Sequence, residues 1–205
     1  MGRPSIGAIH AQAISRLSVV ERYLIKAQTL PPELYGFVAE IMMLRIFSVL
    51  EYTIRETATR LACGVPYRDG VTPVHIIHYC SSIPNAIDNF KTYNRAKAKS
   101  QLQFTNVSQT NDSIKYIIDN SETFRVKLGR YGTQFEEMRK VRNHIAHRTS
   151  STRQGFKDVI RQRYGANVRI KPSAFLVSTK RQPRPIIKEY LTIVKVIIND
   201  VTVSC

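Results

Sequence analysis

Apolar residues recur along most of the chain with the spacing of α-helices rather than with the alternation of strands. The final segment, "PIIKEYLTIVKVIINDVTV", is rich in β-branched residues, yet its large apolar residues are three or four positions apart for nearly four turns. Those residues are Ile187, Tyr190, Leu191, Val194, Ile197, Ile198 and Val201. This spacing predicts a helix. The pattern as a whole predicts an all-α bundle, with helices at about residues 5–27, 33–62, 85–101, 133–147, 153–164 and 185–203 and shorter ones at 75–79 and 114–120.

Several local signals mark where these helices begin and what lies between them. Pro31 and Pro32 separate the first two helices and suit the first turn of the second. Thr133, with Glu136 three residues later, has the spacing of a capping box. The segment 102–113 is predicted to be a loop, and the segment 167–180 a small β-hairpin. Because the chain shows neither an internal repeat nor a strong linker, we expect residues 1–205 to form a single helical domain.

The second predicted helix is apolar around most of its circumference. Its core, "FVAEIMMLRIFSVLEY", is interrupted by Glu40 and Arg45, which favours a buried helix over a membrane span. A single small bundle does not readily cover so much apolar surface, so we expect a face for a second copy and a homodimer. The N-terminus lacks a signal-peptide core, and three scattered cysteines suit a reducing compartment. The predicted protein is therefore cytoplasmic, with no membrane partner.

The charge balance indicates a polyanionic partner. The 205 residues include 31 lysines and arginines against 15 acidic residues, a formal net charge of +16. Between Glu137 and Glu189 the only acidic residue is Asp158. Such a span is either a solvated face or a surface that attracts a phosphate backbone without reading its sequence. The candidate nucleic-acid contacts are Arg139, Lys140, Arg148, Arg153, Arg161 and Arg163.

The most specific candidate for chemistry is "RKVRNHIAHRTSSTR" at residues 139–153. On a helical wheel, Phe135, Met138, Val141 and Ile145 form an apolar stripe, and Asn143 and His147 share a face roughly opposite to it. Histidine transfers protons near neutral pH, and arginine presents a fixed fork to phosphate oxygens. These residue types suit RNA cleavage by attack of the 2′-hydroxyl, although a solvated basic helix end would look similar.

The sequence "RNHIAH", at the end of a late helix in a small all-α protein, resembles the R-N-x-x-x-H motif of the HEPN superfamily. The long apolar helix before it strengthens the likeness, which is nearest to stand-alone bacterial nucleases of the RiboL-PSP kind. The resemblance implies a dimeric, metal-independent endoribonuclease, a toxin or defence effector. By this resemblance, His147 is the acid/base residue, Arg142 contacts the phosphate and Asn143 orients the site. His144 and Glu51 are supporting residues, with Glu51 orienting Arg142.

One position departs from the toxins of this superfamily that are paired with nucleotidyltransferase antitoxins. Those toxins have a tyrosine two residues after the histidine, where this chain has Thr149. We therefore do not expect regulation by modification of such a tyrosine. An antitoxin or another partner from a defence system is still expected for an active nuclease.

Three alternatives compete with this hypothesis. The first is a catalytically silent HEPN module that binds nucleic acid or a protein. The second is a DNA-binding regulator, which would need a recognition helix after a tight turn, and none is evident. The third is a metal site at His75, His78 and Cys80, for which no fourth ligand stands at a recognisable spacing. For want of that fourth ligand we expect no metal, and because the chain lacks both phosphate-binding glycine motifs we expect no cofactor.

Overall fold

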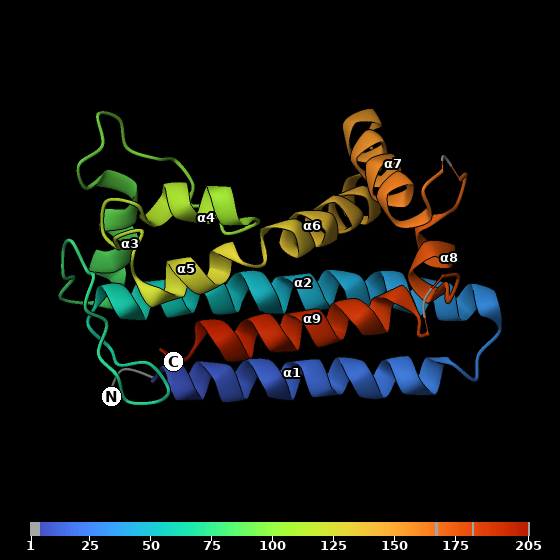
Figure 1. Cartoon of the computed structure of the whole chain (residues 1–205), viewed down its shortest axis with the longest axis horizontal. Helices are drawn as coiled ribbons and strands as arrows, with labels where there is room; N and C mark the ends of the chain where they lie inside the picture. Colours follow the sequence, from blue (N-terminus) through green and yellow to red (C-terminus); the bar gives the residue numbers. More distant parts are fainter. Residues whose placement is uncertain (1–4, 167, 182, 205) are drawn as a thin grey trace. The chain divides into compact units, whose positions relative to one another are not determined.

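The computed structural model describes residues 5–166, 168–181 and 183–204, and the regular elements of these residues are helices, with no sheet (Figure 1). The all-α prediction is confirmed. The helices of the described residues are α1 (Ile6–Ala27), α2 (Pro32–Ala62), α3 (Ile83–Thr92), α4 (Val107–Ile114), α5 (Thr123–Gly129), α6 (Gly132–His147), α7 (Ser150–Tyr164), α8 (Pro172–Val177) and α9 (Ile186–Val201). Among them, no helix combines the length and the apolar composition that a membrane span requires.

The helices belong to two compact units. Unit 1 comprises Met1–Ile14, Leu50–Phe135 and Val196–Cys205, and unit 2 comprises Ser15–Val49 and Glu136–Lys195. Helices α1, α2, α6 and α9 are continuous across the boundaries between these segments. The prediction of a single domain stays a prediction.

Unit 1 contains most of the corrections to the predicted elements. The predicted helix at 85–101 ends at Thr92, since Asn94 has a left-handed backbone (φ 51°). Arg95 then turns its guanidinium toward α4, where Nη2 donates to the carbonyl oxygens of Asp112 (2.6 Å) and Ser113 (3.0 Å). Its Nε also donates to the Phe90 carbonyl at 3.0 Å, so the same side chain caps the last turn of α3.

The segment 102–113 is predicted as a loop and 114–120 as a helix; the loop is confirmed only for 102–106, and the helix prediction is wrong. Helix α4 forms in the predicted loop because the Asn106 side chain caps it, accepting from the Gln109 N–H at 2.7 Å. After Ile114 the chain pairs briefly with 75–79, where the Ile77 N–H donates to the Ile117 carbonyl at 2.9 Å. This pairing replaces the short helices predicted at 75–79 and 114–120.

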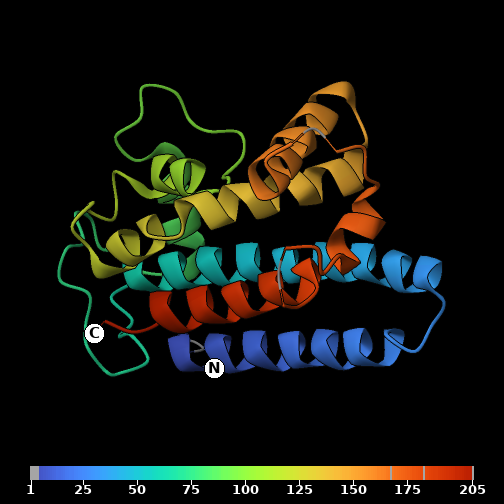
Figure 2. The same ribbon diagram turned by 45° about the vertical axis from the view of Figure 1, so that its right-hand side comes forward.

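Unit 2 is organised around an arginine with two carboxylate partners. Arg163 of α7 donates through Nε to Glu137 of α6 at 2.7 Å, and through both terminal nitrogens to Glu189 of α9 at 2.9 and 3.0 Å. The buried Tyr190 hydroxyl also donates to Glu137, at 2.6 Å. Burial raises the pKa of this hydroxyl, and the Glu137 charge raises it further. In both views, α7 lies beside the C-terminal half of α6 (Figures 1 and 2).

Two predictions about unit 2 are corrected in detail. The described part of 167–180 contains α8 and no hairpin, since Pro172 occupies the first helical turn and the consecutive Phe175 and Leu176 are both buried. Thr133 lies inside α6 rather than at its cap, and Glu136 pairs with Arg139 at 2.6 Å, so the predicted capping box is wrong. Helix α9 confirms the predicted final helix.

We predict that Arg163→Ala lowers the free energy of unfolding by about 3 kcal/mol, because two largely buried carboxylates lose their partner. Urea denaturation measures the change. Lys157→Ala, at an exposed position of the same helix, is the control and should shift stability by no more than about 0.5 kcal/mol. Equal midpoints for both variants would contradict a structural role for Arg163.

Candidate basic groove and histidine site

The C-terminal end of α6 presents the predicted motif. Met138, Val141 and Ile145 are buried, as the wheel predicted, whereas Asn143 is half-buried and the last helical residue, His147, is exposed. The helix stops there because Arg148 adopts a left-handed backbone (φ 50°). The Thr149 hydroxyl then accepts from the Thr152 N–H and caps α7.

Arg142 and Asn143 form one hydrogen-bonded pair. The Arg142 Nη1 donates to the Asn143 Oδ1 at 2.9 Å, and the guanidinium carbon lies 5.8 Å from the centre of the buried Phe47 ring. Since arginine can only donate, the amide oxygen of Asn143 is the atom that faces it. The Asn143 amide nitrogen keeps its capacity to donate to a substrate oxygen. Asn143 therefore contacts Arg142 directly, whereas the resemblance assigned the orientation of Arg142 to Glu51.

His144 occupies a more enclosed position than the motif histidine. Its ring stacks on Phe156 of α7 with centroids 5.0 Å apart, and Nδ1 lies 3.5 Å from the Thr152 hydroxyl. Burial lowers the pKa of the His144 imidazole, and the charges of Arg153 and Arg148 lower it further. His144 is thus held in a defined orientation and favoured in its neutral form.

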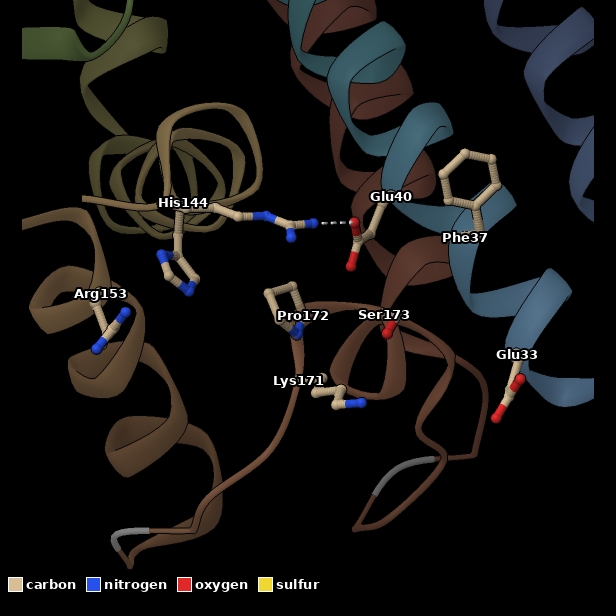
Figure 3. Close-up of a pocket in the computed structure, with 9 residues that line it drawn as sticks. Glu33, Phe37, Glu40, His144, Arg153, Lys171, Pro172 and Ser173 are labelled. Carbon is tan, nitrogen blue, oxygen red and sulfur yellow. Dashed lines mark hydrogen bonds and ion pairs between the residues drawn. The ribbon is translucent and has the colours of Figure 1, made fainter. Parts of the chain in front are cut away.

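Two grooves adjoin in unit 2, and His144 lines both. The α2 groove, of about 460 Å³, is drawn in Figure 3 and receives side chains from α2, α6, α7 and α8 and from the turns beside them. Its lining residues are Glu33, Phe37, Glu40, His144, Arg148, Arg153, Lys171, Pro172 and Ser173. The larger α7 groove, of about 1000 Å³, is lined by His144, Arg153, Gln154, Phe156, Lys157, Ile160, Arg161, Val168, Arg169, Ile170, Lys171 and Pro172.

The six arginines and lysines proposed as nucleic-acid contacts fall into different groups. Arg153 and Arg161 line the α7 groove, and Arg153 and Arg148 line the α2 groove. Arg139 is paired with Glu136, and Lys140 packs its stem against Gly155, where a β-carbon would lie 3.5 Å from Lys140 Cγ.

Arg163 is the sixth of these residues, and its prediction is corrected in part. Its guanidinium is committed to Glu137 and Glu189 inside unit 2. This arginine holds the helices that carry the grooves and is not presented as a phosphate contact.

The remaining predicted residues lie in unit 1. Glu51 is half-buried on α2, and its role in orienting Arg142 stays a prediction. His78 stacks on Tyr93 with centroids 4.2 Å apart, while Cys80 is buried and His75 is exposed. Within the described residues, no three histidine, cysteine, aspartate or glutamate side chains are grouped as metal ligands.

Several groove residues were not identified from the sequence. Phe37 and Glu40 belong to the helix whose uncovered face was predicted to contact a second copy, and the apolar pattern does not show that this face lines a groove. Lys171 and Pro172 lie in the segment that was predicted to be a hairpin. A weak signal was the Lys-Pro pair, since a proline at the start of a helix favours an extended residue before it.

The comparisons with known proteins add no family. No family model matches the chain, no curated protein matches it, and no solved structure matches it. The HEPN resemblance therefore stays a prediction that depends on the residues of α6.

We predict that His144 titrates below about pH 6.5, the usual value for histidine, and that Arg153→Gln raises its pKa by removing a nearby positive charge. NMR titration of the imidazole signals measures this, with His144→Gln to assign the resonance. Because the folded protein binds fewer protons at this site, stability should fall as the pH drops from about 6.5 through the lowered pKa, and less so in His144→Gln. A His144 pKa at or above the usual value would contradict the enclosed position.

Proposed function

We propose that this protein is a metal-independent endoribonuclease that cleaves single-stranded or looped RNA. The observation that carries the proposal is the R-N-x-x-x-H arrangement: an exposed His147 and an Arg142–Asn143 pair stand on a helix whose end, through His144 and Arg148, also lines the α2 groove. The resemblance to HEPN nucleases supports the same reaction class. A growth-arresting toxin or defence effector is the biological role that fits it.

The proposed reaction needs one base, one acid and one cation. His147 takes the proton from the 2′-hydroxyl, whose oxygen attacks the adjacent phosphorus. The bond from phosphorus to the 5′-oxygen breaks, and that oxygen takes a proton from an acid. Arg142, oriented by Asn143 at 2.9 Å, stabilises the charge on the phosphoryl oxygens. The products are a 2′,3′-cyclic phosphate and a free 5′-hydroxyl.

Electrostatics support RNA as the substrate. The residues that line the α7 groove include five cations, Arg153, Lys157, Arg161, Arg169 and Lys171, and no carboxylate. A left-handed backbone is unfavourable for an arginine, yet Arg148 has one, and its side chain is 70% exposed. An arginine kept at such a position supports a binding role for its side chain.

A homodimer is part of the proposal, because one motif supplies only one exposed histidine. Two chains would supply a base and an acid to one cleft.

The second candidate function is a silent module that binds RNA or a protein without cleaving it. The contact of Arg142 with the buried Phe47 ring favours this alternative, since a guanidinium packed on a core side chain also stabilises the fold. Cleavage assays separate the two functions.

We predict that the protein cleaves labelled single-stranded RNA in excess EDTA and leaves 2′,3′-cyclic phosphate ends. His147→Ala should lower the rate about 100-fold or more, because proton transfer is lost. His75→Ala, an exposed histidine of unit 1, is the matched control and should cleave at the rate of the unmodified protein.

Two results would contradict this mechanism. Loss of all cleavage on chelation would return His75 and His78 to consideration as metal ligands. Binding of RNA with no cleavage by the unmodified protein would favour the silent module.

We also predict that the protein sediments as a dimer, and that mixing Arg142→Ala with His147→Ala subunits restores part of the cleavage. Restoration is expected because each mixed dimer retains one intact arginine and one intact histidine. Either variant mixed only with itself is the control. A wild-type monomer that cleaves at full rate would refute the shared cleft.

A further inference from the structure

The two adjoining grooves differ in the charged residues that line them. The α7 groove is lined by cations alone among its charged residues, apart from the titratable His144, and suits a run of phosphates. The α2 groove shares Arg153 and Lys171 with the α7 groove and adds Arg148, but on its α2 side it contains the carboxylates of Glu33 and Glu40. A phosphate lying there would meet two carboxylates. A strand that follows the α7 groove would therefore present something other than a phosphate to the far side of the α2 groove.

An aromatic ring lies on that far side. Glu33, Phe37 and Glu40 are spaced by four and three residues, so they share one face of α2 (Figure 3). Phe37 is 61% exposed, which leaves its ring accessible to a flat ligand. Exposed aromatic rings beside cationic grooves are the usual platforms for unpaired bases. The groove volume of about 460 Å³ also falls within the range of small-ligand sites.

The carboxylates limit which base fits. Arg148 lies 3.4 Å from Glu40, so Glu40 already has a cationic partner. Glu33, in the first turn of α2 and exposed, is the carboxylate presented beside Phe37. A carboxylate only accepts hydrogen bonds. Guanine presents two adjacent donors, N1–H and the 2-amino group, to such an acceptor. Uracil places its one N–H between two carbonyl oxygens that a carboxylate repels.

We propose that the α2 groove is a subsite for one unpaired guanine base of RNA, stacked on Phe37 and read by Glu33, with the flanking phosphates on Arg153 and Lys171. This inference rests on the proposed function, since it specifies which RNA the nuclease prefers. In this arrangement the ribose of the bound nucleotide lies beside His144, and the recognised base lies near the C-terminal end of α6.

The test is the affinity of 2′-O-methyl RNA octamers, which resist 2′-hydroxyl attack, measured by fluorescence anisotropy. The octamers are all uridine, or uridine with a single guanosine, inosine or adenosine. We expect the guanosine octamer to bind about tenfold more tightly than all-uridine, since a two-bond contact discriminates bases by at least this order. Inosine lacks the 2-amino group and should fall between them, and adenosine should bind like uridine.

Variants distinguish the stacking role of Phe37 from the hydrogen-bonding role of Glu33. Phe37→Ala should lower the affinity for the guanosine octamer about fivefold or more, because the stacking surface is lost. Glu33→Gln should abolish the preference for guanosine and leave all-uridine binding unchanged or tighter. Tyr23→Ala removes another exposed ring, 57% exposed on α1 and outside both grooves, and should change neither affinity. Melting temperatures, measured for every variant, should match that of the unmodified protein.

Each other outcome overturns the inference in a recognisable way. If every octamer binds equally tightly and Phe37→Ala has no effect, the subsite is refuted. The proposed function is not contradicted by that result. A guanosine preference that persists in Glu33→Gln would refute the assignment of Glu33 as the group that recognises guanine. Loss of the dimer in Phe37→Ala, with unchanged RNA affinities, would assign this face to a second copy of the chain. Failure to bind any octamer would refute the subsite, and the cleavage assay of the unmodified protein decides separately on the nuclease.

Discussion

The ion pairs of Arg163 with Glu137 and Glu189 hold α6, α7 and α9 together in unit 2, and both grooves depend on them. His144 reaches the grooves from α6 and Arg153 reaches them from α7, so their separation is set by how these two helices pack. Removing three charged groups from water is costly, and the fork of an arginine between two carboxylates offsets that cost only with the close geometry seen here. A basic protein thus uses one of its arginines to position the others.

The basic residues behind the net charge of +16 lie in two kinds of surroundings. Arg139 and Arg163 are neutralised by acidic neighbours, whereas the lining of the α7 groove contains five cations without a carboxylate. Burial lowers the pKa of His144, and the charges of Arg153 in this groove and of Arg148 lower it further, so the groove that attracts a phosphate also favours a neutral imidazole beside it. Electrostatic attraction and proton chemistry are therefore coupled at this place.

The sequence predicts the long helices well and the short ones poorly, for physical reasons. Helices α1, α2 and α9 have many turns of apolar repeat, and the repeat alone indicates their position. Helix α4 depends on one capping side chain, Asn106, and the end of α3 depends on Arg95 reaching residues of another helix. Such tertiary contacts leave no periodic trace.

The same holds for the candidate site: features set by one helix can be predicted from the sequence, and contacts between helices cannot. The wheel correctly predicts that His147 is exposed, because that follows from the helix alone. It cannot reveal that His144 is the histidine enclosed by Phe156 and Thr152, since both partners come from the next helix. It also cannot distinguish Arg163 from the other basic residues of the same helix, which line the groove.

The measurement that tests the central claim most directly is the salt dependence of single-stranded RNA binding to the unmodified protein and to Lys157→Gln/Arg161→Gln/Arg169→Gln. Each phosphate neutralised in the α7 groove releases counterions and contributes about 0.7 to the slope of log affinity against log salt. If the groove binds the RNA backbone, the triple variant should bind more weakly at low salt, with a slope smaller by about two. An unchanged slope would show that these cations are only a solvated face and would contradict the assignment of the groove to RNA.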